Sequence, residues 1–398
     1  MKPSQDTNAA TRFCSRRVCD LTPFMVMEVL EKAHRMERQG IDVVHLEVGE
    51  PDFDTPPAVL EAAHKAMVDG HTHYTHSMGL VELREAIAEH YLDRYGVTVH
   101  PDRIIITQGT SPAMFMLFSA LLEPGDSAVV SDPHYACYPN FIRFAHGEVR
   151  LVRAAEADGF QLRPGAVADV VDDSTRAVLV NSPSNPAGTL LPDESMRALA
   201  DMRPRLVSDE IYHGLVYEGR ERSVLEFTDD CFVLGGFSKL WAMTGWRLGW
   251  LVAPAGFVRG LQVMCQNFFI SANAVAQWAG IAALRDTAED VARMRAIYDE
   301  RRRFMIRRLK EIGFGISVEP TGAFYVLANA RTVLGKKADD SLVLANDILE
   351  RAHVGVTPGI DFGPGAEGCI RFSYANSIEN IARGMDRLER YVAQVQGE

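Results

Sequence analysis

One lysine and one arginine stand in an apolar, glycine-rich stretch of the sequence. Lys239 and Arg247 lie within "GGFSKLWAMTGWRLGW", which runs from residue 235 to residue 250. Lysines in such surroundings usually extend their charge to water. Burial and a nearby cation would instead lower the pKa of the amine from about 10.4, and an uncharged amine can hold a carbonyl carbon as a Schiff base. This stretch alone leaves both interpretations open.

The segment "ITQGTSPAM" has the features of an anion site. Gly109 permits a tight turn after a strand that ends at Thr107, and Ser111 is expected to cap a helix whose first residue is Pro112. The backbone N–H groups of Gly109, Thr110 and Ser111 would then point at one spot beside the positive helix end, which suits a phosphate. An ordinary capped helix explains the same residues. The sequence has no G-x-x-x-x-G-K-[ST] or G-x-G-x-x-G motif, so a nucleotide loop is not predicted.

Three further polar residues follow apolar runs that are expected to be strands. Asn185 lies in "NSPSNPAG", and Asp209 and Tyr212 lie in "RLVSDEIYHG". Each is explained separately by a turn or a helix cap. However, Lys239 also comes shortly after a predicted strand, as these three residues do. Because ligands of parallel α/β sheets bind beyond the carboxyl ends of the strands, we expect these side chains to share one site.

The elements that position these residues are predicted from seven short apolar runs between residues 103 and 253. The runs are "RIIIT", "SAVVS", "VRLVR", "RAVLVNS", "RLVSDE", "FVLGG" and "GWLVAP". Strands this apolar are typical of an α/β fold, in which a mainly parallel sheet is covered by helices on both faces. After about residue 285, a long charged helix and the runs "GAFYVLA" and "GCIRFSYA" predict a smaller α+β domain.

These patterns predict a domain organisation in three parts. Residues 1–22 form an N-terminal arm, and residues 56–285 form the large α/β domain. Residues 23–55, which begin with a helical pattern, join residues 286–398 in the small α+β domain. A chain of 398 residues is long enough for two domains of ordinary size.

The composition narrows the possible partners and compartments. Hydrophobic residues make up 47% and charged residues 24%, which is typical of a globular protein. The formal net charge of -12 argues against a nucleic-acid or anionic-membrane surface. The six cysteines include no C-x-x-C pair and no histidine at zinc-site spacing, so no disulfide framework and no metal site is predicted. The polar N-terminus and the absence of a run of 18 apolar residues favour a cytoplasmic protein.

From about Phe24 to the C-terminal helix, the sequence resembles the class I/II aminotransferases, which are fold type I enzymes dependent on pyridoxal 5'-phosphate (PLP). The segments that carry the resemblance stand in the family's order: "LEVGEPDFDTP", "HYTHSMGLVELREAI", "DPHYACYP", "NSPSNPAG", "SDEIY", "FSKLWAMTGWRLGW" and "GCIRFSYA". The resemblance implies the large PLP-binding domain of fold type I and a smaller second domain. It also implies ping-pong transfer of an amino group from an L-amino acid to a 2-oxo acid.

The resemblance assigns roles around the cofactor ring. Lys239 matches the lysine that holds PLP as a Schiff base and later moves the substrate proton. Asp209 matches the carboxylate that keeps the pyridine nitrogen protonated, so that the ring can accept electrons. Asn185 and Tyr212 match the pair that hydrogen-bonds the 3'-oxygen of the ring, and Tyr135 matches the stacked aromatic residue.

The resemblance also implies how the phosphate and the substrate are held. Arg247 and Ser238, with the amides of residues 109–111, match the phosphate site. Tyr74 matches a tyrosine that reaches the phosphate of the neighbouring subunit, which implies a homodimer. Arg371 matches the arginine that binds the substrate α-carboxylate. The other substrate-binding residues implied are Gly49 and Asn185.

The sequence departs from the family pattern at two positions. Gly236 stands where many members have a serine, which removes one phosphate hydroxyl that Thr110 and Ser111 could replace. Ala187 stands where many members have a threonine, with Asn185 retained. We expect neither change to alter the chemistry.

The resemblance leaves the substrate and the reaction partly open. The segment "VMCQNFFISANAVAQ" contains neither Arg nor Lys, whereas the dicarboxylate-specific branch has an arginine there. Its Met264, Phe268 and Phe269 suggest an apolar or mixed pocket, but the packing of a helical face explains them better. A PLP-dependent C–S β-lyase or a related synthase on the same scaffold is the main alternative. A transcription regulator would need an N-terminal helix-turn-helix, and only some 20 residues precede the first matching helix.

Overall fold

The computed structural model describes residues 14–398 of the chain. Most of the predicted N-terminal arm therefore lies outside the described residues. The first described element is the short helix α2 (Arg16–Cys19), which lies beside α7 (Tyr138–Phe144). No helix in this part of the chain is long and apolar enough to cross a membrane.

A seven-stranded sheet forms the centre of the larger part of the molecule. The strand order is β2-β8-β7-β6-β5-β3-β4, and β8 runs antiparallel to both of its neighbours while the other pairs are parallel. All seven apolar runs of the sequence form these strands, so the predicted mainly parallel sheet is confirmed. The strands are β2 (Ile104–Thr107), β3 (Ser127–Asp132), β4 (Glu148–Arg153), β5 (Thr175–Asn181), β6 (Arg205–Asp209), β7 (Phe232–Gly236) and β8 (Gly249–Val252).

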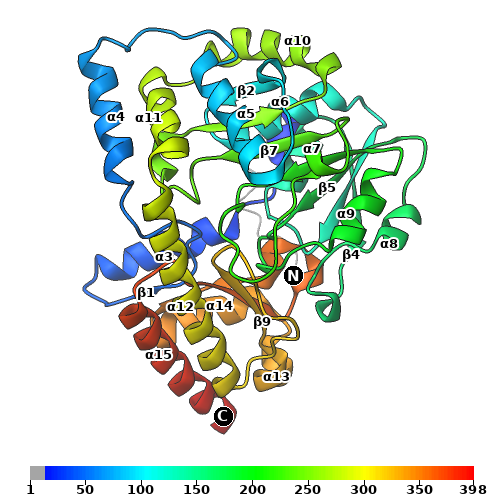
Figure 1. Ribbon diagram of the computed structural model, residues 1–398. Helices are drawn as coiled ribbons and strands as arrows, with labels where there is room; N and C mark the ends of the chain where they lie inside the picture. Colours follow the sequence, from blue (N-terminus) through cyan, green and yellow to red (C-terminus); the bar gives the residue numbers. More distant parts are fainter. Residues whose placement is uncertain (1–13) are drawn as a thin grey trace.

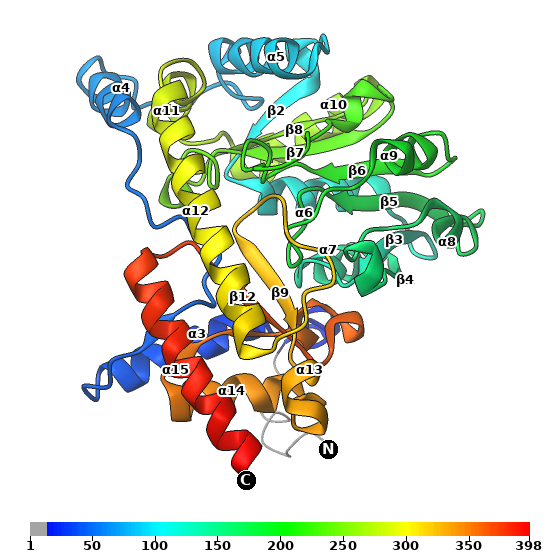
Figure 2. The same ribbon diagram turned by 60° about the horizontal axis from the view of Figure 1, so that its bottom comes forward.

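Helices cover both faces of this sheet (Figures 1 and 2). Alternate residues along each strand face opposite sides; Ile104 and Ile106 of β2 pack into one core cluster and Ile105 into the other. On the side of Ile104 lie α5 (Val81–Tyr95), α8 (Pro164–Ala168), α9 (Asp193–Ala200) and α11 (Ala274–Arg285), with α4 (Pro57–Val68) against α11. On the side of Ile105 lie α6 (Thr110–Leu121), α7 and α10 (Ala255–Met264).

The smaller part of the molecule is built on two short sheets. One is the antiparallel sheet of β11 (Thr357–Pro358), β12 (Cys369–Ser373) and β9 (Tyr325–Asn329), and the other pairs β1 (Val44–His45) with β10 (Val354–Gly355) in parallel. The helices around them are α3 (Met25–Glu37), α12 (Ala288–Ile312), α13 (Arg331–Leu334), α14 (Ser341–Ala352) and α15 (Ile378–Gly397). Helix α12 runs from beside α11 down to α15 and so joins the two parts (Figures 1 and 2).

The two-part architecture confirms the predicted fold class, an α/β unit with a smaller α+β unit. The N-terminal helix α3 packs with the C-terminal elements, because it contacts β10 and β11 of the smaller part. The domain boundaries at residues 55/56 and 285/286 remain predictions.

Candidate active site

A cavity of about 330 Å³ lies between the strand ends of the large sheet and the smaller part of the molecule. It is bounded on one side by loops that follow β5, β6 and β7, and on the other by α3, β9 and β12. Most of the site residues named from the sequence lie on its wall. They are Gly49, Thr110, Ser111, Tyr135, Asn185, Asp209, Tyr212, Ser238, Lys239, Arg247 and Arg371.

Lys239 follows β7 and projects into this cavity from the turn after the strand. Its Nζ donates a hydrogen bond to the carbonyl oxygen of Gly49 at 2.6 Å. Desolvation lowers the pKa of the amine to about 8, although the Glu50 carboxylate raises it; the cations Arg371 and Arg247 lower it further. The neutral amine is therefore accessible near physiological pH, which favours the reactive-lysine interpretation of the sequence.

Asp209 is the last residue of β6, and its buried carboxylate faces the same cavity. Its Oδ2 accepts a hydrogen bond from the Tyr138 hydroxyl at 2.7 Å, and its Oδ1 accepts one from the Ile211 amide at 3.2 Å. Burial raises the pKa of Asp209 to about 6, while these two donors lower it. The side-chain amide of Asn181 donates to the Asp209 carbonyl at 2.8 Å and its oxygen accepts from the Asn185 amide at 2.7 Å. The loops after β5 and β6 are thereby joined.

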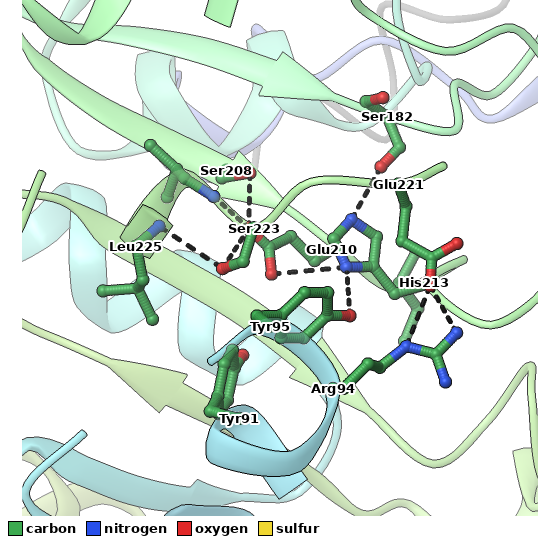
Figure 3. Close-up of polar contacts among 12 residues, drawn as sticks. Tyr91, Arg94, Tyr95, Ser182, Ser208, Glu210, His213, Glu221, Ser223 and Leu225 are labelled. Carbon is green, nitrogen blue, oxygen red and sulfur yellow. Dashed lines mark hydrogen bonds and ion pairs between the residues drawn. The ribbon is translucent and has the colours of Figure 1, made fainter. Parts of the chain in front are cut away.

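Glu210, next to Asp209, belongs to a buried polar network behind the cavity wall (Figure 3). Its Oε1 accepts hydrogen bonds from the hydroxyls of Ser208 and Ser223, each at 3.1 Å, and from the Val224 amide at 2.9 Å. Its Oε2 is buried without a hydrogen-bond partner, 3.5 Å from Nδ1 of His213. Burial raises the pKa of Glu210 to about 8, so that the group is mainly a neutral acid at pH 7.

His213 completes this network on the side of α5 (Figure 3). Its Nε2 lies 2.9 Å from the Ser182 carbonyl oxygen, which can only accept, so Nε2 donates. Its Nδ1 then accepts from the Tyr95 hydroxyl at 2.7 Å. Burial lowers the pKa of His213 to about 4, so the imidazole is neutral at pH 7. The loop that carries Asp209 and Tyr212 therefore has an uncharged, hydrogen-bonded support.

Arg371 lies on β12 at the opposite wall, and only 2% of the residue is exposed. It donates from Nη1 to Oδ1 of Asn185 at 3.0 Å, and from Nη2 to the Glu47 carbonyl at 2.5 Å and the Thr357 hydroxyl at 3.1 Å. The Tyr325 ring centroid lies 4.3 Å from its guanidinium carbon. Its Nε is buried without a partner, and within residues 14–398 no carboxylate pairs with it. A buried cation with an unused donor suits an anionic ligand.

The proposed phosphate end of the cavity differs from the sequence prediction in one detail. Helix α6 begins at Thr110, and Gly109 is its N-cap with φ of 93°, so Ser111 is not the cap. The positive φ of Gly109 turns the chain directly from β2 into the helix, which leaves Ser111 in the first turn. A Cβ atom at Gly109 would come within 2.7 Å of Nη2 of Arg247, so a glycine is needed for this approach.

Two tyrosines of the site were not assigned a role from the sequence. Tyr325, within "GAFYVLA", packs against Arg371, and its hydroxyl lies 2.9 Å from that of Tyr212. It also lies where a Cβ atom on Gly49 would be, which explains the glycine there. Tyr138, within "DPHYACYP", holds Asp209. Tyr325 lies in a segment predicted to be a strand, and Tyr138 lies in a segment that matches a family motif. Neither kind of pattern shows which side chain contacts a distant loop.

Tyr74 lies outside the cavity. It is 81% exposed and lines a separate surface hollow together with Gln108 and Arg247. Gly109 also does not line the cavity itself, but it adjoins Arg247, which does. Tyr135 lines the cavity, edge-on to Phe24 at 5.9 Å and to Tyr138 at 5.2 Å between ring centroids.

Comparisons with known proteins agree with this fold. The family model "Aminotransferase class I and II" matches residues 41–388. The chain is 38% identical to an aspartate/prephenate aminotransferase from Thermus thermophilus, over 96% of this chain and 100% of that one. It is 37% identical to a (5-formylfuran-3-yl)methyl phosphate transaminase from Methanocaldococcus jannaschii, over 95% of this chain and 99% of that one.

Solved structures show the same likeness in three dimensions. An aspartate aminotransferase from Thermus thermophilus with maleate superposes with a TM-score of 0.90 at 38% identity, covering 95% of this chain and 99% of that one. A structure from Methanococcus jannaschii, described as similar in its active site to kynurenine aminotransferases, gives 0.89 at 37% identity, covering 96% and 100%.

A lysine and a buried acid at the strand ends of the large sheet thus face a buried arginine of the smaller part across one cavity. The chain belongs to the class I and II aminotransferases. The predicted recognition and the predicted amino-group transfer are confirmed, and these relatives give no support to the lyase alternative.

Proposed function

We propose that the cavity binds pyridoxal 5'-phosphate and uses it to transfer an amino group from an L-amino acid to a 2-oxo acid by a ping-pong mechanism. The observation that carries the proposal is the amine of Lys239 and the carboxylate of Asp209 facing one cavity. The remaining donors fit the other groups of the cofactor. Arg247 suits the phosphate, together with the first turn of α6 and Ser238, while Asn185 and Tyr212 suit the ring oxygen.

Each wall residue then has a defined task. When bound, the cofactor ring accepts the electron pair of the broken substrate Cα–H bond. Lys239 would hold the cofactor through its amine and would serve as the base for the substrate Cα proton. Asp209 would keep a proton on the ring nitrogen, because a positive charge beside it favours its ionised form; burial raises the pKa of Asp209 to about 6, although the Tyr138 and Ile211 donors lower it.

Arg371 binds the α-carboxylate of the substrate. Its buried and unpaired Nε supplies a donor, and Asn185 and Thr357 fix the plane of the guanidinium. A carboxylate held in this way orients the Cα–H bond toward Lys239. Amino acids and 2-oxo acids share this carboxylate, so one arginine serves both halves of a ping-pong reaction.

The part of the cavity wall that α3 forms suggests the class of substrate side chain. Helix α3 and the residue before it contribute Phe24, Val26, Met27 and Leu30. Apart from Lys239, Arg247 and Arg371, no lysine or arginine lines the cavity within residues 14–398, whereas Glu50 does. A second carboxylate on the substrate would face an anion and apolar groups. We therefore propose an apolar or aromatic amino acid as the substrate, unlike the dicarboxylates named for several relatives.

A half-reaction screen tests both parts of this proposal. The purified holoenzyme is mixed with single amino acids, without a 2-oxo acid, and the visible absorption of the lysine-bound cofactor is followed. We expect phenylalanine, leucine or methionine to react at least ten times faster than aspartate, about 1.4 kcal/mol. A preference for aspartate would overturn the substrate class alone. No conversion by any amino acid, or release of ammonia with a sulfur amino acid, would overturn the transfer mechanism in this cavity.

We also propose a homodimer in which Tyr74 completes the partner's phosphate site. Tyr74 is 81% exposed and lines a surface hollow together with Arg247. A second hollow, lined by Met67, adjoins the first, because Trp246 and Asn273 line both. Met67, at this second hollow, is an exposed apolar side chain, as expected of a subunit interface; Leu60 and Val68 on the same helix are exposed as well.

Subunit mixing tests the shared site. Lys239→Ala and Tyr74→Ala chains are inactive or impaired as homodimers, but a heterodimer has one site with both native residues. We expect co-refolded or co-expressed chains to regain up to half of the wild-type activity. Activity no higher than that of the two separate homodimers would show that Tyr74 acts within its own subunit or not at all.

A further inference from the structure

His34, Glu37 and His45 meet on the surface of the smaller part, away from the active-site cavity. His34 and Glu37 are three residues apart on α3, so they share one face of the helix, and His45 is the last residue of β1. Nε2 of His45 lies 3.0 Å from Oε1 of Glu37, and the rings of His34 and His45 are 5.7 Å apart between centroids. One ligand atom from each residue lies within 4.8 Å of the other two.

Glu47 provides a second and independent observation behind this cluster. Its carboxylate is fully buried, with Oε1 2.6 Å from Nδ1 of His45 and Oε2 without a hydrogen-bond partner. Because carboxylates only accept, Nδ1 of His45 donates to Glu47 and Nε2 donates to Glu37, so a metal ion would replace the proton on Nε2. That nitrogen faces Glu37 on the protein surface. Metal-binding histidines have this arrangement, with one ring nitrogen on a carboxylate and the other on the metal.

We propose that His34, Glu37 and His45 bind a divalent transition-metal cation of the Zn²⁺ class, with Glu47 orienting His45 from inside the protein. Two imidazole nitrogens and one carboxylate oxygen suit Zn²⁺, whereas Mg²⁺ and Ca²⁺ prefer oxygen ligands alone. A positive ion at Nε2 also compensates the buried charge of Glu47. His34 and Glu37 are exposed, so the fourth ligand position is open to water.

The site would join the C-terminal end of α3 to β1. The other end of α3 forms the active-site wall through Val26, Met27 and Leu30. A metal at His34 and His45 would therefore strengthen the link between α3 and β1 that the contacts of His45 with Glu37 and His34 already make. The spacing of cysteine and histidine residues in the sequence does not predict this site, because the cluster is formed only by the fold.

Direct Zn²⁺ titration of the holoenzyme tests the proposal. The protein is treated with a chelator, which is then removed, and ZnCl₂ is added in a calorimeter. We expect one Zn²⁺ ion per chain in wild type and at least about tenfold weaker binding in His34→Asn, because one ligand is lost. His34 is exposed, so this variant keeps the fold and the contacts of Glu47, His45 and Glu37. His64→Asn, at another exposed helical histidine, is the matched control and should bind as wild type does.

Thermal unfolding gives a second measurement that does not depend on activity. Zn²⁺ at a large excess over its Kd should raise the Tm of wild type and of His64→Asn, because it binds only the folded chain. The Tm of His34→Asn should change little. Equal Zn²⁺ affinity in wild type and His34→Asn, or no saturable binding by wild type, would overturn the proposal. His45 would then serve only as the charged partner of Glu47 and Glu37.

Discussion

The two walls of the active-site cavity are held in different ways. On the sheet side, Asp209 is positioned by the amide of Ile211, two residues away, and by Tyr138 from the neighbouring layer. On the opposite side, Arg371 is positioned by Asn185, 186 residues away in the sequence, and by the carbonyl of Glu47, 324 residues away. The sheet wall is thus formed by strand ends together with a helix that packs on the sheet. The substrate wall exists only when the two parts of the molecule are packed together.

This difference separates cofactor binding from substrate binding. Substitutions on the sheet wall should weaken cofactor binding and slow every later step. Substitutions on the other wall should leave cofactor binding unchanged. Lys239 lies at the junction, because it comes from the sheet side and its amine donates to Gly49 on the other side. The expected effects of substitution can therefore be ordered by wall.

Replacing Lys239 should have the largest effect, since it belongs to both walls. We expect Lys239→Ala to lose the visible absorption of the bound cofactor and all turnover above background, because no other amine lines the cavity within the described chain. Absorption spectra and steady-state rates measure this. Lys65→Ala, at an exposed helical lysine, is the control and should behave as wild type. Residual turnover in Lys239→Ala at a tenth of the wild-type rate would contradict the role of this amine.

Removing Arg371 should damage the substrate wall alone. Loss of one partner of a buried charged interaction costs about 2 to 5 kcal/mol, so kcat/KM of Arg371→Ala should fall by roughly 30-fold to several thousand-fold for every amino acid. Cofactor affinity, measured by fluorescence titration, should stay within about twofold. Arg303→Ala, at an exposed position on α12, is the matched control. If cofactor affinity fell as far as kcat/KM, the separation of the two walls would be wrong.

Tyr138→Phe probes the sheet wall without removing a charge. A hydrogen bond to a charged group contributes about 1.5 to 3 kcal/mol, so cofactor affinity should fall by roughly 10- to 150-fold. The Tyr138 hydroxyl lowers the pKa of Asp209, and its loss should move the acid limb of the kcat/KM profile to higher pH. A pH series in wild type and variant measures both effects. An acid limb at the same pH in the two proteins would mean that Tyr138 does not act through Asp209.

The sheet wall was also the part that could be predicted from sequence. Apolar runs such as "RAVLVNS" form strands covered on both faces, and the residues after them, such as Asp209, reach the cavity because parallel strands end at one edge. The partners of those residues could not be predicted. Tyr138 meets Asp209 across 71 positions and Tyr325 meets Tyr212 across 113, and such contacts are set by the packing of whole elements.

The error at the start of α6 has a local cause. Ser111 and Pro112 have the residue types of an N-cap and a first helical position, yet Gly109 alone could take the positive φ that the turn from β2 requires. The backbone requirement overrode the side-chain preference. In the same way, His34 and His45 lie eleven positions apart with no spacing signal, and they meet because β1 pairs with β10, which α3 contacts.

The smallest expected effect concerns the support of the sheet wall and appears in stability. Folding raises the pKa of Glu210 from an ordinary value of 4.5 to about 8. The unfolded chain therefore releases this proton above pH 4.5 while the folded chain keeps it, so the contribution to stability is full below pH 4.5 and is lost as pH rises through 8. Glutamine keeps the shape of the neutral acid and cannot ionise. The difference in the free energy of unfolding, Glu210→Gln minus wild type, should therefore increase from pH 5 to pH 8.

The change in that difference should reach at least about 1.4 kcal/mol, the equivalent of one pKa unit. Denaturant unfolding of both proteins at several pH values, with the same cofactor saturation, measures it. Burial depresses the pKa of His213 to about 4, so this histidine lowers the free energy of unfolding at acid pH, which is the opposite pH dependence. Both proteins contain His213, and its contribution therefore cancels when their free energies of unfolding are compared. Parallel pH dependence in wild type and variant would mean that Glu210 is ionised in the folded protein. The support behind Asp209 would then carry a negative charge, and the walls would differ in charge as well as in construction.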